Sequence, residues 1–110
     1  MKASRADSSP AGVVASRDSA YGPGLPRISE FYGIVVEMYF ADHAPPHFHA
    51  RYAGDGALIA IRSGDVIAGG LPRRALAFVR EWLDLHREEL LANWTRARAR
   101  QPLEPIDPLP

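Results

Sequence analysis

The chain of 110 residues contains no cysteine, which excludes disulfide bonds, a cysteine nucleophile and cysteine-ligated metals. It also lacks a charge excess, because 13 basic and 13 acidic side chains balance, so no overall field attracts it to nucleic acid or anionic membranes. No apolar run reaches membrane-spanning length, and no apolar stretch after Lys2 and Arg5 suggests a secretory signal. P-loop, dinucleotide-binding and H-E-x-x-H motifs are missing. We therefore expect a cytoplasmic protein that does not bind membranes.

Segments poor in apolar residues flank the central part of the sequence. Residues 1–25 are mainly Ala, Ser, Gly, Pro and charged residues, so we expect a disordered N-terminal tail; an upstream start codon, with the functional protein beginning near Leu25–Pro26, is the alternative. Prolines recur through residues 102–110 and predict an extended C-terminal tail. Residues 26–101 remain as one domain. Because so small a core is marginal alone, a homodimer or a protein partner would help to stabilise it.

The apolar patterns of this domain predict an α+β fold of two layers, with three or four antiparallel strands followed by one long or broken helix. Runs of β-branched and aromatic residues place the strands at 31–40, 47–53, 57–62 and 66–68. Pro72 fits the first turn of a helix, and apolar residues then recur with helical spacing through residue 98. A straight helix of that length would extend about 40 Å, so we expect a bend near residues 85–87.

Alternation along the first two strands assigns side chains to the two faces of the sheet. One set is apolar and should face the core: Ile34, Val36, Met38, Phe40, Phe48, Ala50 and Tyr52. The other set is polar and should share the opposite face: Glu37, Tyr39, His47, His49 and Arg51. A six-residue connection would place Tyr39 beside His47 or His49, and Glu37 beside His49 or Arg51.

Three of the four histidines lie within seven residues. His47 and His49 are two residues apart on a strand, so their rings point the same way and can bind one cation. His43, across a turn that two prolines restrain, is a candidate third ligand, and Asp42 can add an oxygen. The pattern therefore indicates a site for zinc or a similar divalent metal.

The same residues support two further interpretations. Histidine titrates near neutrality, so His47 and His49 could act as general base and acid in the cleavage of RNA, with Arg51 on the phosphate and Tyr39 as a hydrogen-bond donor. Alternatively, the histidines only order the turn through hydrogen bonds, in a non-catalytic interaction module. The residues alone leave these alternatives open.

Candidates outside the cluster are expected to be structural. His86 lies on the apolar stripe of the helix and should be a core or boundary histidine. Trp82 and Trp94 have helical spacing and should pack in the core or at a partner interface. The basic end of the helix suits the helix dipole. The alternative is a small phosphate-contacting patch, formed by Arg73, Arg74, Arg96, Arg98 and Arg100.

Four motifs resemble those of a known small bacterial family, catalogued as domain of unknown function forty-one-sixty. They are Phe31–Ile34 (FYGI), Met38–Phe40 (MYF), Asp42–Ala50 (DHAPPHFHA) and Leu71–Leu76 (LPRRAL). The resemblance extends from about Pro26 to about Ile106. Members of the family usually start near the position of Pro26, which agrees with a tail over residues 1–25.

The resemblance implies no established activity, and it gives no verified role to the motif residues Asp42, His43, His47, Phe48 and His49. Members are typically encoded beside a second small protein, an arrangement that resembles toxin–antitoxin pairs. The first hypothesis is therefore a component of such a two-gene module, which binds a cognate small protein and, if it is an enzyme, acts on RNA. The rival hypotheses are a zinc-type metal-binding protein and a non-catalytic interaction module.

Overall fold

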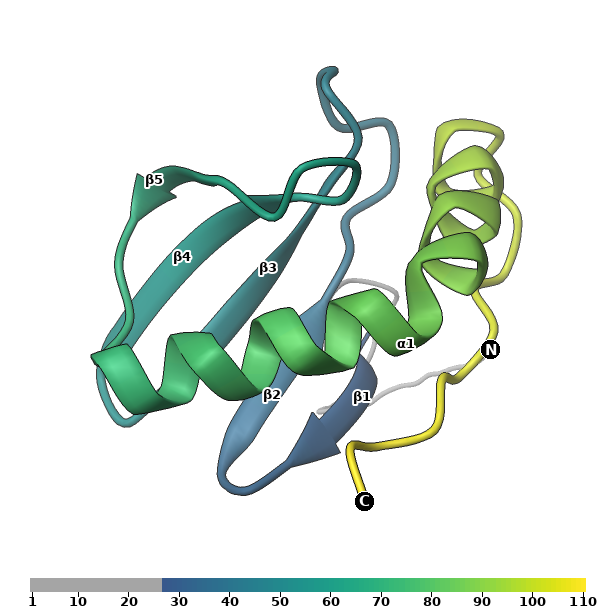
Figure 1. Cartoon of the computed structure of the whole chain (residues 1–110). Helices are drawn as coiled ribbons and strands as arrows, with labels where there is room; N and C mark the ends of the chain where they lie inside the picture. Colours follow the sequence, from purple (N-terminus) through teal and green to yellow (C-terminus); the bar gives the residue numbers. More distant parts are fainter. Residues whose placement is uncertain (1–26) are drawn as a thin grey trace.

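The computed structural model describes residues 27–110, so the expected tail over residues 1–25 lies outside the described part. Five antiparallel strands precede one helix (Figure 1): β1 Arg27–Phe31, β2 Ile34–Glu37, β3 His47–Tyr52, β4 Asp55–Ala60, β5 Val66–Gly69 and α1 Arg73–Arg98. The strands form one sheet in the order of the chain. The predicted α+β class is confirmed, with five strands rather than three or four. Among the described residues, no helix has the length and apolar character that crossing a bilayer requires.

The prediction of one strand over residues 31–40 is wrong, because the chain reverses direction at Tyr32 and Gly33. Tyr32 and Gly33 have φ values of 53° and 79°, and they connect β1 to β2 as a two-residue hairpin. Such turns usually contain Asn-Gly or Asp-Gly, so a Tyr-Gly pair within an apolar run hides the reversal. Consequently β1 begins at Arg27, where the sequence predicts no strand, and β2 ends at Glu37.

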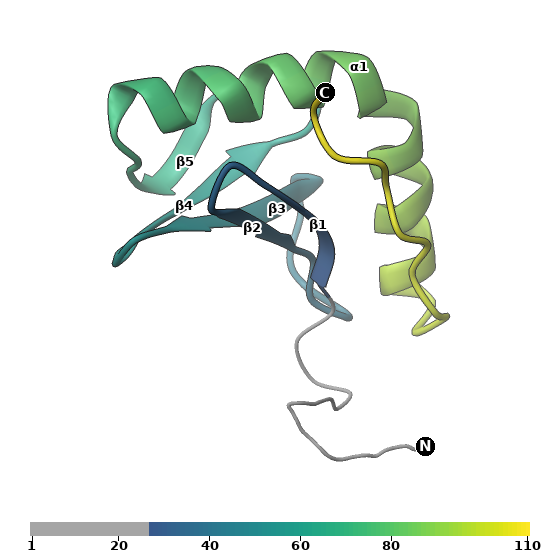
Figure 2. The ribbon, with the colours of Figure 1, turned by 90° about the horizontal axis from the view of Figure 1, so that it is seen from below.

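The core lies between the sheet and the first half of α1, which covers one face of the sheet (Figure 2). As predicted, the apolar alternating residues of β2 and β3 face this core: Ile34, Val36, Phe48 and Ala50 are fully buried. The indole of Trp82 in α1 lies edge-on to Phe48, with ring centroids 5.8 Å apart. The helix is therefore held on the sheet by an aromatic contact near its centre.

The bend predicted near residues 85–87 is present at His86, whose φ and ψ of −124° and 21° are not helical. At this point the guanidinium of Arg87 donates to the carbonyl oxygen of Ile61 at 2.9 Å, which fastens the bend to the end of β4. The first half of α1 crosses the sheet, and the second half turns along its side (Figures 1 and 2). Because of this turn, Trp94 reaches His47, with ring centroids 5.1 Å apart.

Residues 102–110 form neither helix nor strand, and they pack against the domain. Ile106 and Leu109 are buried, and the backbone N–H of Ile106 donates to the carbonyl oxygen of Ile28 in β1 at 2.8 Å. The indole N–H of Trp82 donates to the carbonyl oxygen of Asp107 at 2.8 Å. The segment expected as an extended tail therefore adds side chains to the core and covers the outer edge of β1.

Asn93 anchors the start of this segment to the second half of α1. Its side chain is fully buried. The amide group donates to the carbonyl oxygen of Glu104 at 2.8 Å and accepts from the backbone N–H of Glu104 at 2.9 Å. The same oxygen accepts from Arg96 at 2.9 Å. One amide thus satisfies both backbone groups of a residue eleven positions away.

Replacing Asn93 with alanine tests this anchor. The substitution leaves both backbone groups of Glu104 without their protein partner, so we expect the free energy of unfolding to fall by about 1–3 kcal/mol. Amide hydrogen exchange should also become faster over residues 104–110. Thermal melting and exchange measured by NMR check both effects.

Thr95→Ala is the matched control, because Thr95 lies on the same half of α1 and bonds to the Leu91 carbonyl of its own helix. It should change stability by less than about 0.5 kcal/mol. Wild-type melting and exchange in the Asn93→Ala protein would mean that other contacts hold the segment.

Candidate functional site

The candidate site lies where the connection over residues 38–46 meets β3 and the second half of α1. The backbone N–H of Ala41 donates to the carbonyl oxygen of Ala97 in α1 at 3.0 Å, and the N–H of Ile61 donates to the carbonyl oxygen of Pro46 at 3.0 Å. These two bonds fix the connection at its start and at its end. The loop is therefore held against the helix on one side and against the end of β4 on the other.

One of the two expected neighbours of Glu37, His49, is confirmed, but the connection between the strands spans residues 38–46 rather than six residues. Glu37 lies opposite His49, and Val35 lies opposite Arg51. The Tyr39 ring packs on the His49 ring, with centroids 4.2 Å apart. The polar side chains of the two strands therefore share one face, as strict alternation requires.

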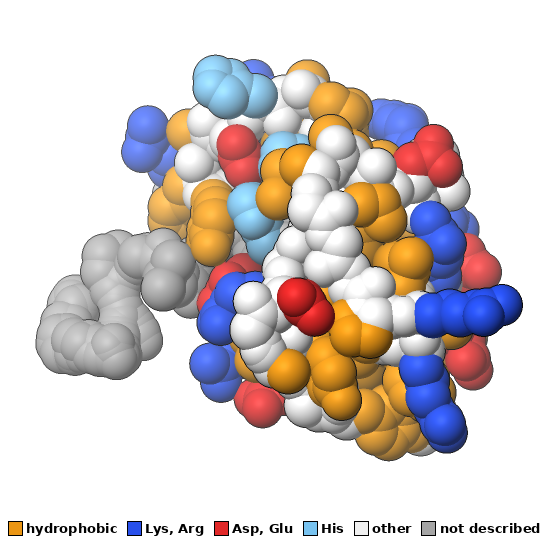
Figure 3. Space-filling view, turned by 90° about the vertical axis from the view of Figure 1, so that its left-hand side faces the viewer, with side chains coloured by type: hydrophobic (Ala, Val, Ile, Leu, Met, Phe, Trp, Pro, Cys, Tyr) orange, Lys and Arg blue, Asp and Glu red, His pale blue; other side chains and the backbone are white. Residues whose placement is uncertain are grey.

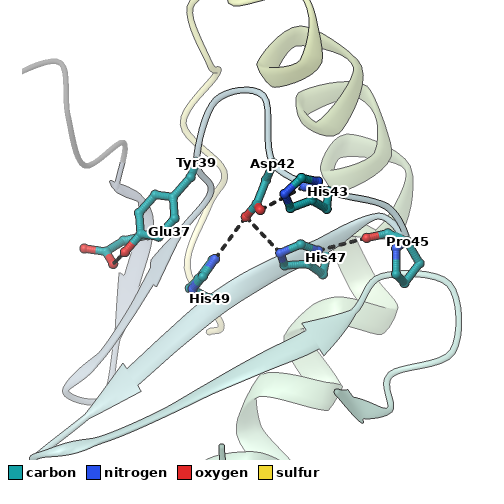
Figure 4. Close-up of polar contacts among 7 residues, drawn as sticks. All are labelled: Glu37, Tyr39, Asp42, His43, Pro45, His47 and His49. Carbon is teal, nitrogen blue, oxygen red and sulfur yellow. Dashed lines mark hydrogen bonds and ion pairs between the residues drawn. The ribbon is translucent and has the colours of Figure 1, made fainter. Parts of the chain in front are cut away.

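Asp42 lies close to the ring nitrogens of two histidines (Figure 4). Its Oδ2 atom lies 3.0 Å from Nε2 of His47 and 3.4 Å from Nε2 of His49. These three side chains each offer one ligand atom, and all three atoms lie within 4.8 Å of one another. The structure thus brings together Asp42, His47 and His49, three of the four predicted metal ligands.

Two polar contacts orient the His47 ring. Its Nδ1 atom lies 2.8 Å from the carbonyl oxygen of Pro45, and because a carbonyl oxygen only accepts, Nδ1 carries the hydrogen. Nε2 is then the atom that faces Asp42. The side chain is 5% exposed and contacts the indole of Trp94. Burial and two polar partners therefore fix the orientation of this ring.

Asp42 and His49 form the accessible side of the cluster. Their side chains are 24% and 19% exposed, and histidine side chains reach the molecular surface next to an acidic one in Figure 3. Partial burial disfavours the charge of Asp42. The backbone N–H of His43 and the rings of His49 and His47 outweigh this effect, and the pKa of Asp42 is lowered. The carboxylate is therefore ionised and reachable from solvent.

His43, the fourth predicted ligand, is not in this group. Its backbone N–H donates to Oδ1 of Asp42 at 2.9 Å, but its side chain is exposed. This contact turns the carboxylate of Asp42 so that Oδ2 points to the other two histidines (Figure 4). His43 thus contributes through its backbone, which a pattern based on residue type cannot reveal.

Arg51 and Tyr39 contact Glu37 beside the cluster. Arg51 donates to both oxygens of Glu37, at 3.1 Å and 2.8 Å, and the Tyr39 hydroxyl donates to Oε1 at 3.3 Å. Only 2% of the Glu37 side chain is exposed. The hydrogen bonds to Glu37 raise the pKa of Arg51, and burial, then the charge of Glu37, raises the pKa of Tyr39. Tyr39 is therefore neutral and Arg51 is committed to an ion pair.

The remaining predicted candidates lie elsewhere. His86 sits at the bend of α1, between Trp82 and Glu89. The two groups of arginines do not form one patch, since Arg73 and Arg74 begin α1 whereas Arg96 and Arg98 end it. Trp94 is a part of the site that the sequence patterns did not assign, whereas the contact between His47 and the carbonyl group of Pro45 is of the kind expected if the histidines order the turn. Helical spacing marks Trp94 as a packing residue, but nothing in the pattern shows that it packs on His47.

The ion pair beneath the site yields a stability prediction. Arg51→Ala leaves the buried carboxylate of Glu37 without its cation, so we expect a loss of at least about 2 kcal/mol; fully buried pairs lose about 3–5 kcal/mol, and Arg51 is half-exposed. Glu37→Gln should cost less, because it leaves no uncompensated buried charge. Urea denaturation measures both values.

Arg27→Ala serves as the control for Arg51→Ala, because Arg27 pairs with Glu30 and both side chains are more than half exposed. This exposed pair should contribute less than about 1 kcal/mol. Equal losses in the two arginine variants would contradict a structural role for the Glu37–Arg51 pair.

The part of the chain that contains the candidate site matches a known protein family. The chain has no significant match among curated proteins or among solved structures. A family model matches residues 33–95, a range that includes β2 to β5, the complete cluster and most of α1. The match covers more than half of the 110 residues. The chain therefore belongs to the family described as a domain of unknown function, DUF4160.

Proposed function

We propose that this protein binds a divalent transition metal of the zinc type through Asp42, His47 and His49. Two imidazole nitrogens and one carboxylate oxygen are ligands that zinc accepts at about 2.0–2.2 Å. A tetrahedral ion at that range needs ligand atoms about 3.4 Å apart. The distances of 3.0 Å and 3.4 Å from Asp42 to the two rings are close to this value, and the two histidine nitrogens lie within 4.8 Å of each other.

The two polar contacts of the His47 ring are the observation that carries the proposal. Nδ1 donates to Pro45, so a neutral ring directs the lone pair of Nε2 at Oδ2 of Asp42, 3.0 Å away. Two acceptors at that distance repel each other. Either the buried ring is a doubly protonated imidazolium, or a cation binds both atoms. A backbone carbonyl group on Nδ1 with a metal on Nε2 is a common arrangement for histidine ligands.

The accessibility of the cluster favours an open coordination position. Three protein ligands leave a fourth place for water or another small molecule, as in catalytic zinc sites. The partly exposed side chains of Asp42 and His49 border that place. A water bound there would ionise near neutral pH, which would supply the nucleophile for hydrolysis. Two histidines and one carboxylate also suit iron(II), so the identity of the ion is part of the test.

The hypotheses of RNA cleavage and of a two-gene module receive less support from the geometry. Cleavage would require Arg51 to contact a phosphate, but two of its guanidinium nitrogens already bind Glu37. Binding to a cognate small protein rests on the family resemblance alone. Co-purification with the product of an adjacent gene tests that hypothesis, and growth of bacteria expressing the protein alone tests toxicity.

The metal proposal predicts that protein purified without a histidine tag binds one ion per chain. Elemental analysis after expression, followed by titration of the apoprotein with zinc and cobalt(II), measures the stoichiometry, and cobalt absorption reports the ligand geometry. His49→Ala removes one ligand from the accessible side, so we expect affinity to fall by more than about 10-fold. Asp42→Asn should act similarly, because its amide is a poorer ligand.

His43→Ala is the matched control, since it removes a neighbouring imidazole and keeps the backbone N–H that orients Asp42. Its affinity should equal that of the wild type. Absence of bound metal in the wild type, or equal weakening in the His43 and His49 variants, would refute the proposal and favour a buried imidazolium–carboxylate pair.

A further inference from the structure

A small cavity lies at the other end of β3, between the β1–β2 turn and the start of α1. Its volume is about 170 Å³. Three aromatic side chains and one arginine line it together with apolar residues: Tyr32, Tyr52, Phe78 and Arg74. We call these four residues the aromatic slot. The metal ligands do not contribute to it, so a ligand of the slot would bind independently of the proposed metal site.

The rings of the slot are held before any ligand arrives. Tyr32 lies 5.0 Å from Phe78 between ring centroids, and its hydroxyl donates to the carbonyl oxygen of Pro110. The Tyr32 backbone is in the left-handed region, with φ of 53°, where non-glycine residues are uncommon. Nevertheless, this side chain is 53% exposed. The turn therefore presents an aromatic ring at the surface from a backbone conformation that is uncommon for a residue with a side chain.

The charge at the rim of the slot is positive. The guanidinium carbon of Arg74 lies 5.8 Å from the centre of the Phe78 ring. The first turn of α1 contains no acidic residue that would neutralise Arg74. An arginine that stacks on an aromatic ring keeps its N–H groups free to bind a phosphate in a forked arrangement. The rim thus complements an anionic group carried by a planar ring.

We propose that the aromatic slot binds a nucleotide, with the base in the cavity against the aromatic side chains that line it and the phosphate on Arg74. A dry cavity of about 150 Å³ is sufficient for one benzene ring, so the slot matches a single pyrimidine ring. Aromatic side chains stack on bases of any sequence, and arginine adds cation–π attraction. The ligand is therefore a pyrimidine nucleoside monophosphate or one such unit of a single strand.

The slot and the metal-ligand cluster lie at opposite ends of β3. His47 begins the strand and Tyr52 ends it, a separation of about 17 Å at 3.3 Å per residue. The slot opens on the side covered by the first half of α1, whereas His47 and His49 project from the other face of β3. A single mononucleotide cannot occupy both sites, so binding to the slot is measurable with the metal site intact.

Titration with uridine monophosphate, followed by two-dimensional NMR, tests the proposal. We expect a dissociation constant on the order of 0.1–1 mM, with shifts of the Tyr32, Tyr52 and Phe78 ring signals. Arg74→Ala should weaken binding of the nucleotide about 10-fold and leave the weaker binding of uridine unchanged. Phe78→Leu should weaken the binding of both uridine monophosphate and uridine. If that variant unfolds, the comparison of Arg74→Ala with its control variant still tests the proposal.

Arg73→Ala is the matched control, because Arg73 carries the same charge as the adjacent Arg74 but does not line the cavity. Its effect should be less than about twofold. Equal weakening by the two arginine variants, binding of inorganic phosphate as tight as that of the nucleotide, or absence of binding at about 10 mM, well above the expected range, would overturn the proposal. Tighter binding of N-acetyl-tyrosine amide would assign the slot to a peptide and would also overturn it.

Discussion

The bend of α1 at His86 is the constraint on which the remaining structure depends. A straight helix would cover only one face of the sheet, whereas the bent helix contacts both faces of β3 at consecutive residues. Trp82 packs on Phe48, and Trp94 packs on His47. Because the carbonyl oxygen of Ala97 also binds the loop at Ala41, the bent half of the helix encloses the residues that precede β3. The candidate site exists because this loop is held between helix and sheet.

The polar face of β2 and β3 is less accessible than simple alternation suggests. Glu37 and His47 are nearly as buried as the core residues, and each depends on charged or polar partners for compensation. Glu37 obtains them from Arg51 and Tyr39, and His47 obtains them from the backbone and from Asp42. This arrangement concentrates strong electrostatic interactions in a small volume, which is typical of binding and catalytic sites.

Structural features that follow from the periodicity of apolar residues were predictable from the sequence. Features that depend on a single contact between distant residues or with the backbone were not. Alternation gave the faces of β2 and β3 and limited the neighbours of Glu37 and Tyr39 to two candidates each, while helix length gave the bend. The β1–β2 turn was missed because its Tyr-Gly pair lies in an apolar run. The role of His43 depends on its backbone N–H, and that of Asn93 on a partner eleven residues away. Residue type and spacing carry no signal for such contacts.

The C-terminal segment touches both halves of α1, since Trp82 binds Asp107 before the bend and Asn93 binds Glu104 after it. It therefore acts as a brace across the angle between the two halves. The second half of α1 carries Trp94, which packs on His47. The angle between the two halves therefore determines where Trp94 lies beside the histidine cluster. A truncation or fusion within the last ten residues would consequently alter a site to which those residues make no direct contribution.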